Sequence, residues 1–472
     1  MKKKHVLLLN LFFLILVGCN NSYEEIQKTP VGVNKYDPNK PTTPNLINPT
    51  YGVIDQTFII EGNFPGAITN MKVYFGTKRA VLIATDGQSI MGIVPKQPEG
   101  YNQISLVIGK DSLVPAKMLF KYKQSRSVRT ICGKLGTQLW MSDASYAGAP
   151  MDAVTLGEVH YVATVAGQKS DNIFMVESGW GNRLFLLSQD DNTITKLSTP
   201  DCLGALAVPS TRDKFYCTRF WDGDHPIWMY SKANSWAFIS CGVTVAKADW
   251  PGSKTPSTTF GADDNLLYLL DTEGRIAEVN LSDKSYKVYT TAAKKPANIT
   301  AKNWGGLITG TVLPSNFGSW EDSYITYSKF HKAFFVSYTA ENAIYKYVKN
   351  ADNTWTCTLW AGKNGSGSTV GDRLKDAQFT SPSGLVVNAD GDIFVCNHGG
   401  CAWCNNGHVI NRISGDAVEV VAGMVGSISP LVNGTNPLEA TFCVPRNLAI
   451  DFEGNYFIAG GNDWTVRKLS IE

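Results

Sequence analysis

A cysteine- and histidine-rich stretch near the C-terminal end holds side chains suited to covalent or metal chemistry. It reads CNHGGCAWCNNGH and contains Cys396, His398, Cys401, Cys404 and His408. Several interpretations stay open. In an exported protein, a disulfide could form between Cys401 and Cys404 or could use Cys396, or the thiols could remain unpaired and structural. The stretch could instead hold a tetrahedral Zn²⁺ through four ligands, Cys396, Cys401, Cys404 and His408, although one CxxC pair alone is a weak zinc signal. A redox site is the least favoured, because no βαβ pattern surrounds the pair.

Tryptophans beside acids, an amide and an arginine form a second group of candidate residues. They are Arg219, Trp221, Asp222 and Asp224 in one segment, Asn462, Asp463 and Trp464 in another, and Trp180 and Trp403. Indole rings stack on the apolar faces of sugar rings, while the polar side chains bond the hydroxyls. We therefore predict that these nine residues bind a glycan. The alternative is that the tryptophans pack between sheets and the acids cap turns.

An enzymatic interpretation needs acids, amides or histidines that converge. Candidates at the starts of predicted strands are Glu158, His160, Asp322, Arg446 and Asn447, but nothing in the sequence shows that they meet. The sequence contains no G-x-S-x-G elbow, no HExxH and no P-loop. No catalytic residue can be assigned from the sequence, and a non-catalytic role is favoured.

The elements that would position these residues are strands, and one pattern is written twice. Residues 377–395 read AQFTSPSGLVVNADGDIFV and residues 440–458 read ATFCVPRNLAIDFEGNYFI. A repeated strand–turn–strand grammar with a long period is typical of a repeat architecture. A four-strand unit can be laid out six times from about Arg126, and the sixth unit lacks its fourth strand. The segment Val128–Lys134 supplies a strand of the missing type.

We therefore predict that residues 126–472 form a six-bladed β-propeller closed by an N-terminal strand, which leaves no exposed sheet edge. The loops between second and third strands and the loops between units would then share one face. The tryptophans named above fall in these loops, and the segment 291–322 is expected to be one of the long ones. Loops longer than ~12–15 residues are usually functional or disordered.

The N-terminal part of the chain has a different sequence pattern. Residues 46–123 contain six short alternating strands punctuated by Gly and Pro, which predicts a separate β-sandwich. Before it, three lysines and the apolar run Val6–Val17 predict a secretory signal peptide over residues 1–18. Residues 19–45 are polar and proline-containing, so we expect a flexible tether. With 43 basic and 41 acidic residues the chain is nearly neutral, which argues against nucleic-acid binding.

Three sequence features resemble known families. The tetrad LVGC at 16–19 resembles a bacterial lipobox, which implies lipidation of Cys19. Residues 46–123, with GNF, VYFG and FKY, resemble IPT/TIG immunoglobulin-like domains, and the A-x-F-x-x-P repeats resemble NHL repeats. In this order they resemble surface lipoproteins of Bacteroidetes polysaccharide-utilisation systems.

That resemblance implies a lipid-anchored protein of the outer membrane, exposed at the cell surface. Its partners would be a glycan or oligosaccharide and an outer-membrane transporter complex, with membrane contact through the lipid only. We rank a glycan-binding lipoprotein first, a propeller hydrolase or lyase acting on carbohydrate second, and a protein–protein adhesion or scaffold module third. Fold alone cannot choose among them.

Overall fold

The computed structural model describes residues 35–115, 117–137, 146–177, 183–252, 254–255, 257–314, 323–402, 404 and 406–471. Their regular structure is β-strand, which confirms the all-β class. The only helices in these ranges are short 3₁₀ turns, η1 (Ile68–Asn70), η2 (Lys232–Asn234), η3 (Ala292–Lys294), η4 (Thr339–Glu341) and η5 (Pro437–Glu439). None of them is long and apolar enough to span a bilayer. The predicted signal peptide and Cys19 lie outside the described residues.

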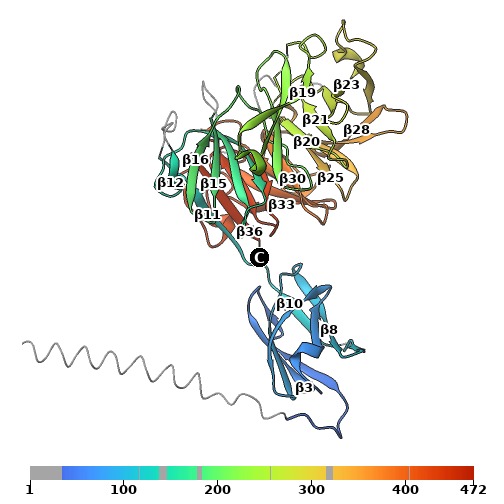
Figure 1. Cartoon of the computed structure of the whole chain (residues 1–472), viewed down its shortest axis with the longest axis vertical. Helices are drawn as coiled ribbons and strands as arrows, with labels where there is room; N and C mark the ends of the chain where they lie inside the picture. Colours follow the sequence, from blue (N-terminus) through green and yellow to red (C-terminus); the bar gives the residue numbers. More distant parts are fainter. Residues whose placement is uncertain are drawn as a thin grey trace, which may run out of the picture. The chain divides into compact units, whose positions relative to one another are not determined.

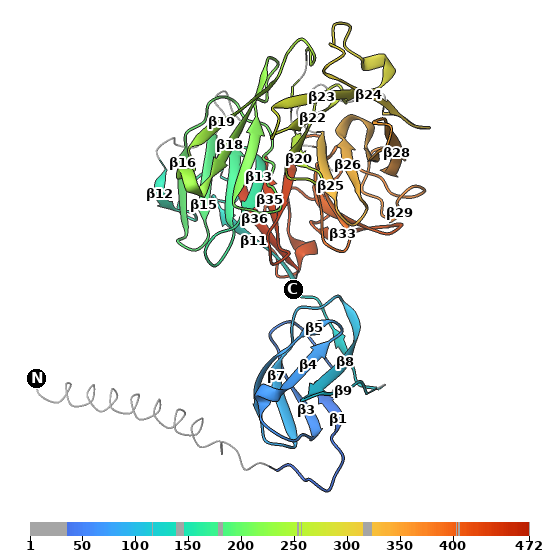
Figure 2. The same ribbon diagram turned by 45° about the vertical axis from the view of Figure 1, so that its right-hand side comes forward.

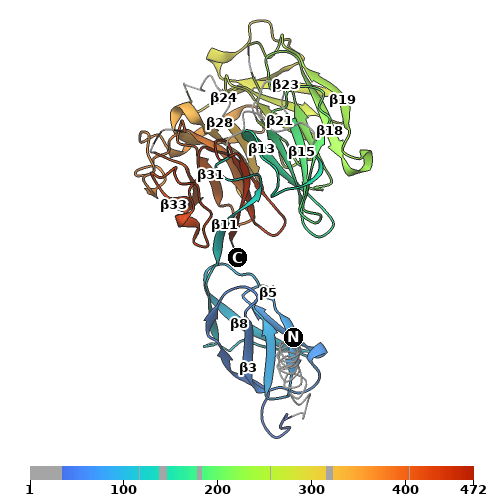
Figure 3. The same ribbon diagram turned by 90° about the vertical axis from the view of Figure 1, so that its left-hand side faces the viewer.

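The chain divides into two compact units, one ending at Ser125 and the other spanning Arg126–Ile471. The first unit, in blue in Figure 3, contains two sheets. One has the order β1 (Thr43–Asn48), β3 (Thr57–Asn63), β7 (Ser89–Ile93), β6 (Val81–Thr85). The other has the order β2 (Tyr51–Gly52), β10 (Leu119–Tyr122), β8 (Gly100–Ile108), β4 (Met71–Phe75), β5 (Lys78–Arg79), and β9 (Asp111–Leu113) also pairs with β8.

Strict alternation explains why these segments form half-buried strands. In β10, Phe120 and Tyr122 are buried while Leu119 and Lys121 are exposed, as period-two side-chain placement requires. The buried residues of both sheets, among them Phe58, join one hydrophobic core. The six strands expected in this region are all present.

The described structure of the first unit includes residues before 46, where the sandwich is predicted to start. Strand β1 begins at Thr43 and pairs with β3. Upstream of it, the amide of Asn63 donates to the carbonyls of Asp37 (2.8 Å) and Lys40 (3.0 Å). A polar, proline-containing segment can therefore be part of a fold when a buried amide side chain donates to its carbonyls.

The second unit contains five sheets, seen in Figure 1 from green to red. Two of them have five strands: β12 (Ala147–Pro150), β16 (Thr193–Leu197), β15 (Arg183–Ser188), β14 (Asn172–Glu177), β13 (Val159–Val165); and β29 (Gly371–Asp372), β33 (Ala417–Ala422), β32 (Val409–Ser414), β31 (Ile393–Asn397), β30 (Pro382–Val387). A third has β17 (Lys214–Thr218), β18 (His225–Ser231) and β19 (Phe238–Val245).

The largest sheet has nine strands because two antiparallel arrays are joined. They are β20 (Ser257–Phe260), β21 (Leu266–Leu270), β22 (Ile276–Asn280), β23 (Ser285–Thr290) and, in the other array, β25 (Tyr324–Ser328), β26 (Ala333–Tyr338), β27 (Ala343–Lys349), β28 (Trp355–Gly362). Strand β24 (Trp304–Thr309) pairs parallel with both β23 and β28, and Figure 2 shows it beside β23. The segment 291–322 is therefore not simply a loop, because part of it joins two sheets.

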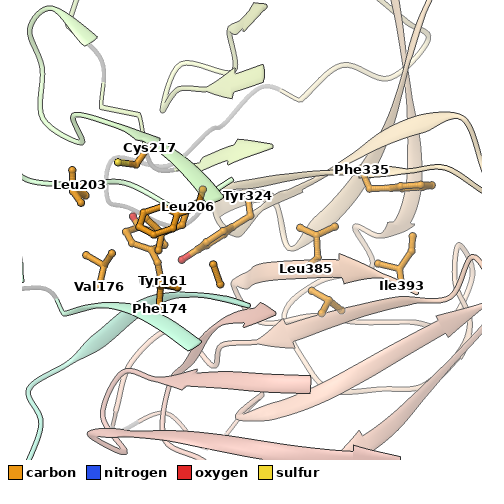
Figure 4. Packing of buried hydrophobic residues seen from close by; sticks show 14 of the residues in the cluster. Tyr161, Phe174, Val176, Leu203, Leu206, Cys217, Tyr324, Phe335, Leu385 and Ile393 are labelled. Atoms are coloured by element: carbon orange, nitrogen blue, oxygen red, sulfur yellow. The ribbon is translucent and has the colours of Figure 1, made fainter. Parts of the chain in front are cut away.

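The first strands of successive sheets lie against one another. Strand β34 (Pro445–Ile450) contacts both β13 and β30, and β25 contacts both β30 and β20. Side chains carry hydrogen bonds across these contacts. The amide of Val162 donates to Asn447 Oδ1 (3.0 Å), and that of Ile325 donates to Ser257 Oγ (3.0 Å). A hydrophobic cluster shared by several sheets, including Tyr161, lies beside them (Figure 4).

The start and the end of the second unit meet in one sheet. Strand β11 (Arg126–Cys132) pairs antiparallel with β36 (Thr465–Ile471), followed by β35 (Tyr456–Gly460) and β34. This is the pairing expected of an N-terminal strand that supplies the missing fourth strand. Val128 of β11 is buried in a cluster with Leu469 of β36.

A charge introduced on the buried side of β11 should destabilise the second unit selectively. We expect Val128→Asp to lower its free energy of unfolding by about 3 kcal/mol or more, because a carboxylate would replace buried apolar surface. The adjacent Arg129→Asp, on the exposed side of the same strand, should change it by less than about 0.5 kcal/mol. All 12 tryptophans lie beyond residue 125, so urea unfolding followed by indole fluorescence reports on this unit. Equal effects of the two variants would contradict the pairing.

Candidate functional site

A polar cluster forms where β13 and β34 begin. Glu158 directly precedes β13, and its Oε2 lies 3.2 Å from His160 Nε2 and 3.6 Å from Arg446 Nη2. From the turn between β35 and β36, the Asn462 amide donates to Glu158 Oε1 (3.4 Å). The structure thus brings together three of the residues that an enzymatic interpretation would need and one of the predicted glycan-binding residues.

The electrostatics of the cluster keep Glu158 ionised. The hydrogen bond with His160 lowers the pKa of Glu158, and the charge of Arg446 acts in the same direction against partial burial. The Glu158 side chain remains 39% exposed, whereas His160 is buried and Arg446 is only slightly exposed. The cluster therefore offers solvent a fixed carboxylate with hydrogen-bond donors behind it.

His398 belongs to the surroundings of this cluster. It is buried, and burial holds the pKa of His398 well below its usual value, with Arg446, His408 and His160 adding to the effect. Its Nδ1 accepts from the backbone amide of Gly400 (3.2 Å). The cysteine-rich stretch therefore places a neutral imidazole, that of His398, near the polar cluster.

In the same stretch the structure joins Cys401 and Cys404 by a disulfide. Cys396 is a buried thiol in β31 whose pKa is raised by burial. His408 Nε2 lies 2.8 Å from the Cys404 carbonyl, and its Nδ1 accepts from the Val444 amide (3.1 Å). Three of the four residues considered for zinc, Cys401, Cys404 and His408, thus make other bonds, and no group of three metal ligands occurs among the described residues.

The predicted segment 219–224, between β17 and β18, contains one exposed indole. Trp221 is 42% exposed, and Lys254 Nζ lies 4.6 Å from its ring centroid. Arg219 Nε lies 3.3 Å from an Asp201 carboxylate oxygen. Asp222 accepts from Lys247 Nζ (2.7 Å) and Asp224 accepts from the backbone amide of the same lysine (2.8 Å). The two acids fix the turn, and the indole and its lysine remain open to solvent.

The turn between β35 and β36 divides its predicted residues. Asn462 reaches the cluster, and Trp464 is half-buried with a positive φ of 53°. Asp463 is completely buried, where its carboxylate accepts from the Cys443 amide and lies 3.4 Å from Arg467 Nη1. The Asp463 carboxylate therefore lies beneath the turn and stabilises it, and it does not face solvent beside Asn462.

Three of the remaining candidates lie outside the described residues, and two others have structural roles. Trp180, Trp403 and Asp322 lie outside the described residues. Asn447, considered for catalysis, bonds the β13 backbone instead. His225, in β18, is completely buried against Thr255.

The structure contains a cavity that the sequence did not reveal. It lies at the C-terminal ends of β13, β30 and β34, whereas the polar cluster lies where β13 and β34 begin. It has a volume of about 560 Å³ and is lined largely by aliphatic residues, with Arg212, Lys329 and Phe330 among its polar or exposed residues. A smaller space of about 100 Å³, lined by residues of β13, β20, β25, β30, β34 and the segment 205–208, shares Val162 and Leu448 with it. Only the exposed Phe330 could have indicated this cavity from the sequence. Aliphatic strand residues have the same sequence pattern whether they line a core or a cavity.

Solved structures share this fold. A structural genomics protein of unknown function from Bacteroides thetaiotaomicron matches with a TM-score of 0.73 at 22% identity, covering 93% of this chain and 100% of that one. Auxiliary nutrient binding proteins from B. thetaiotaomicron and Bacteroides ovatus match with TM-scores of 0.55 and 0.54, at 15% and 17% identity, each covering 93% of this chain and 100% and 99% of theirs. No family model and no curated protein matches the chain.

Because three histidines are buried, we expect the free energy of unfolding to fall on mild acidification. Burial lowers the pKa of His225, His398 and His408 below the ordinary value of 6.5. The unfolded chain then binds protons that the folded chain does not, so stability is full above pH 6.5 and falls as the pH drops below it. From pH 7.5 to 6 we expect each histidine to contribute a loss of at most about 0.8 kcal/mol.

Urea midpoints followed by indole fluorescence would measure this change. Burial raises the pKa of Asp463 to about 6, so this carboxyl begins to take up a proton in the folded chain within the window and offsets about 0.4 kcal/mol of the loss by pH 6; the window ends there because the offset grows at lower pH. A midpoint that stays constant between pH 7.5 and 6 would contradict the buried neutral state of these imidazoles.

Proposed function

We propose that this chain is a lipid-anchored surface protein of a Bacteroidetes nutrient-uptake system. In this proposal residues 46–123 are an immunoglobulin-like IPT/TIG domain, and the second unit is a six-bladed NHL-type propeller. The propeller binds a glycan at the polar cluster of Glu158, His160, Arg446 and Asn462, and the anchor at Cys19 holds the protein at the outer membrane.

The convergence of the cluster carries the proposal. Glu158 and Asn462 are far apart in the chain but meet at the ends of neighbouring strands. A half-exposed carboxylate, an arginine and an amide supply the acceptors and donors that orient a polyhydroxylated ligand. Trp464 follows Asn462 by two residues, and Trp221 lies in the corresponding second-to-third-strand loop of another sheet, so indole surface is available on loops of the same kind.

The state of Glu158 favours binding over hydrolysis. A general acid that protonates a glycosidic oxygen near neutral pH works best with a raised pKa. The hydrogen bond from His160 instead lowers the pKa of Glu158. A carboxylate held ionised accepts hydrogen bonds from sugar hydroxyls and has no proton to give to a glycosidic oxygen. The runner-up, a carbohydrate hydrolase or lyase, is supported by the same convergence of Glu158 and His160, and a test must therefore detect products as well as binding.

The fold shared with two auxiliary nutrient binding proteins of Bacteroides is in keeping with this function. A likeness at 15–17% identity concerns the fold and leaves the ligand open. The glycan is therefore argued from the chemistry of the cluster and the indoles, and an outer-membrane transporter complex as partner rests on the resemblance of the sequence alone.

Two substitutions should weaken glycan binding without weakening the fold. We expect Glu158→Gln and Trp221→Ala each to reduce affinity by at least tenfold, about 1.4 kcal/mol, because one removes the charged acceptor and the other the stacking surface. The soluble form, residues 20–472, would be run through gels containing single polysaccharides, with reducing ends assayed in parallel. Glu273→Gln, which breaks only a surface pair with Lys294 (2.6 Å), is the matched carboxylate control.

The outcomes separate the candidate functions. Retardation by a glycan without new reducing ends supports a binding protein, and new reducing ends lost in Glu158→Gln would replace it with the hydrolase or lyase. If Glu158→Gln and Glu273→Gln bind alike, the cluster is not the site. If no glycan retards the protein, a protein partner is favoured. A pull-down from solubilised outer membranes would then search for that partner.

The anchor is tested separately. Cys19→Ala removes the thiol that would carry the lipid, so the full-length protein should move from the membrane fraction to the soluble fraction after cell lysis. Immunoblots of the two fractions measure the shift, with Cys202→Ala as a cysteine control within the second unit. Membrane association that survives Cys19→Ala would refute the lipoprotein assignment.

A further inference from the structure

Three side chains form a row on the outer face of one sheet of the first unit. Lys121 of β10 pairs in register with Tyr51 of β2 and with Tyr101 of β8. Residues paired in register project from the same face of a sheet. Burial agrees with this, because the alternate residues Gly52 and Phe120 are buried. We call Tyr51, Lys121 and Tyr101 the tyrosine row.

The row is open to solvent to an unusual degree for aromatic side chains. Tyr51 is 66% exposed and Tyr101 is 70% exposed. Lys121 Nζ lies 5.7 Å from the Tyr101 ring centroid, which places a cation against one of the two rings. Single exposed apolar residues are common on protein surfaces, but two tyrosines fixed on either side of a lysine by strand pairing present a defined surface.

The charged side chains on the strands of this face are cations, and the acid nearest the row in sequence, Glu99, is exposed and directly precedes β8. Strands β2, β10, β8, β4 and β5 contain no carboxylate, while Lys72 of β4 is exposed beside the half-buried Tyr74. The acid among the strands of this sheet is Asp111 in β9, which pairs with Ile108 at the opposite end of β8 from Tyr101. The face therefore complements a negatively charged ligand that also has apolar ring faces.

We propose that the tyrosine row is a second binding surface, for an extended anionic polysaccharide whose sugars carry carboxylate or sulfate groups. The proposal shares only the ligand class with the proposed function and uses none of its residues. Tyr51 and Tyr101 stand two strand spacings apart, about 10 Å, a span that a chain of sugars bridges and a monosaccharide does not. The rings stack on sugar faces, and Lys121 pairs with the anionic group between them.

The test uses the soluble form in gels containing polygalacturonate, chondroitin sulfate or neutral dextran. We expect retardation by at least one of the two anionic polymers, stronger at low salt, and none by dextran through this surface. Tyr51→Ala with Tyr101→Ala should reduce that affinity about tenfold or more, and Lys121→Gln should remove most of its salt dependence. Val81→Ala, an exposed apolar residue on the other sheet, and Lys232→Gln, an exposed lysine of the second unit, are the controls.

Each result bears on one surface. Anionic-polymer binding that the tyrosine variants leave unchanged, or no such binding by the wild type, overturns this inference whatever happens at Glu158. Loss in the tyrosine variants but not in Glu158→Gln supports it even if the proposed site in the second unit fails. Because the tyrosines are exposed, unchanged thermal unfolding of the variants would show that the loss is not a folding defect. Competition by galacturonic acid monomer as strong as by the polymer would overturn the extended-ligand assignment.

Discussion

Buried edge strands impose the central constraint on the second unit. Strands β13, β30 and β34 stand at the ends of their sheets, and β20 and β25 stand at the two ends of the nine-stranded sheet. Their outer backbone groups have no ladder to join, although they face protein rather than water. A buried amide or carbonyl without a partner costs about 1–3 kcal/mol, so each contact between sheets needs polar side chains placed to meet it.

The sequence supplies these side chains at the contacts themselves. Thr258 donates to the Ala205 carbonyl (2.7 Å), Ser337 donates to the Ser383 carbonyl (2.6 Å), and Ser383 donates to the Pro445 carbonyl (3.2 Å). With the bonds of Asn447 and Ser257, they connect neighbouring strand arrays of the second unit. The bond from β13 to Asn447 also sets β13 against β34, and it is this contact that brings Glu158 to Arg446. The polar cluster therefore depends on the same bonds that join the sheets.

This dependence explains what could be predicted from the sequence. The strands were recognisable because alternation and apolar runs are local, and the pairing of β11 with β36 followed from a strand missing at one end and present at the other. The sheet of β17, β18 and β19 was harder, because the segment before it makes only isolated bridges, Leu203 with Arg219 and Ala207 with Tyr216. Strand β24 was missed because it contains two glycines and pairs parallel at the outer edges of two arrays, which leaves no alternating signal.

The site was predicted less well for a related reason. A polar residue at the start of a strand has the same sequence signature whether it faces a ligand or meets a backbone group. Asn447 and Arg446 are adjacent, yet one joins two strands and the other joins the cluster. Asp463 sits between a residue that reaches Glu158 and an indole, and it is buried because its carboxylate stabilises the turn. Only the three-dimensional pairing separates these roles.

Two separate binding surfaces would act together on a polymer even if each were weak. The tyrosine row and the polar cluster belong to different units, joined by the short segment between Tyr122 and Arg126. Once one surface holds a polysaccharide, the other meets its repeating units at a high effective concentration. A polymer offers binding units at many spacings, so this gain does not require one fixed arrangement of the two units. If both proposals hold, modest contacts at exposed rings and one fixed carboxylate would together retain a long glycan more strongly than a short one.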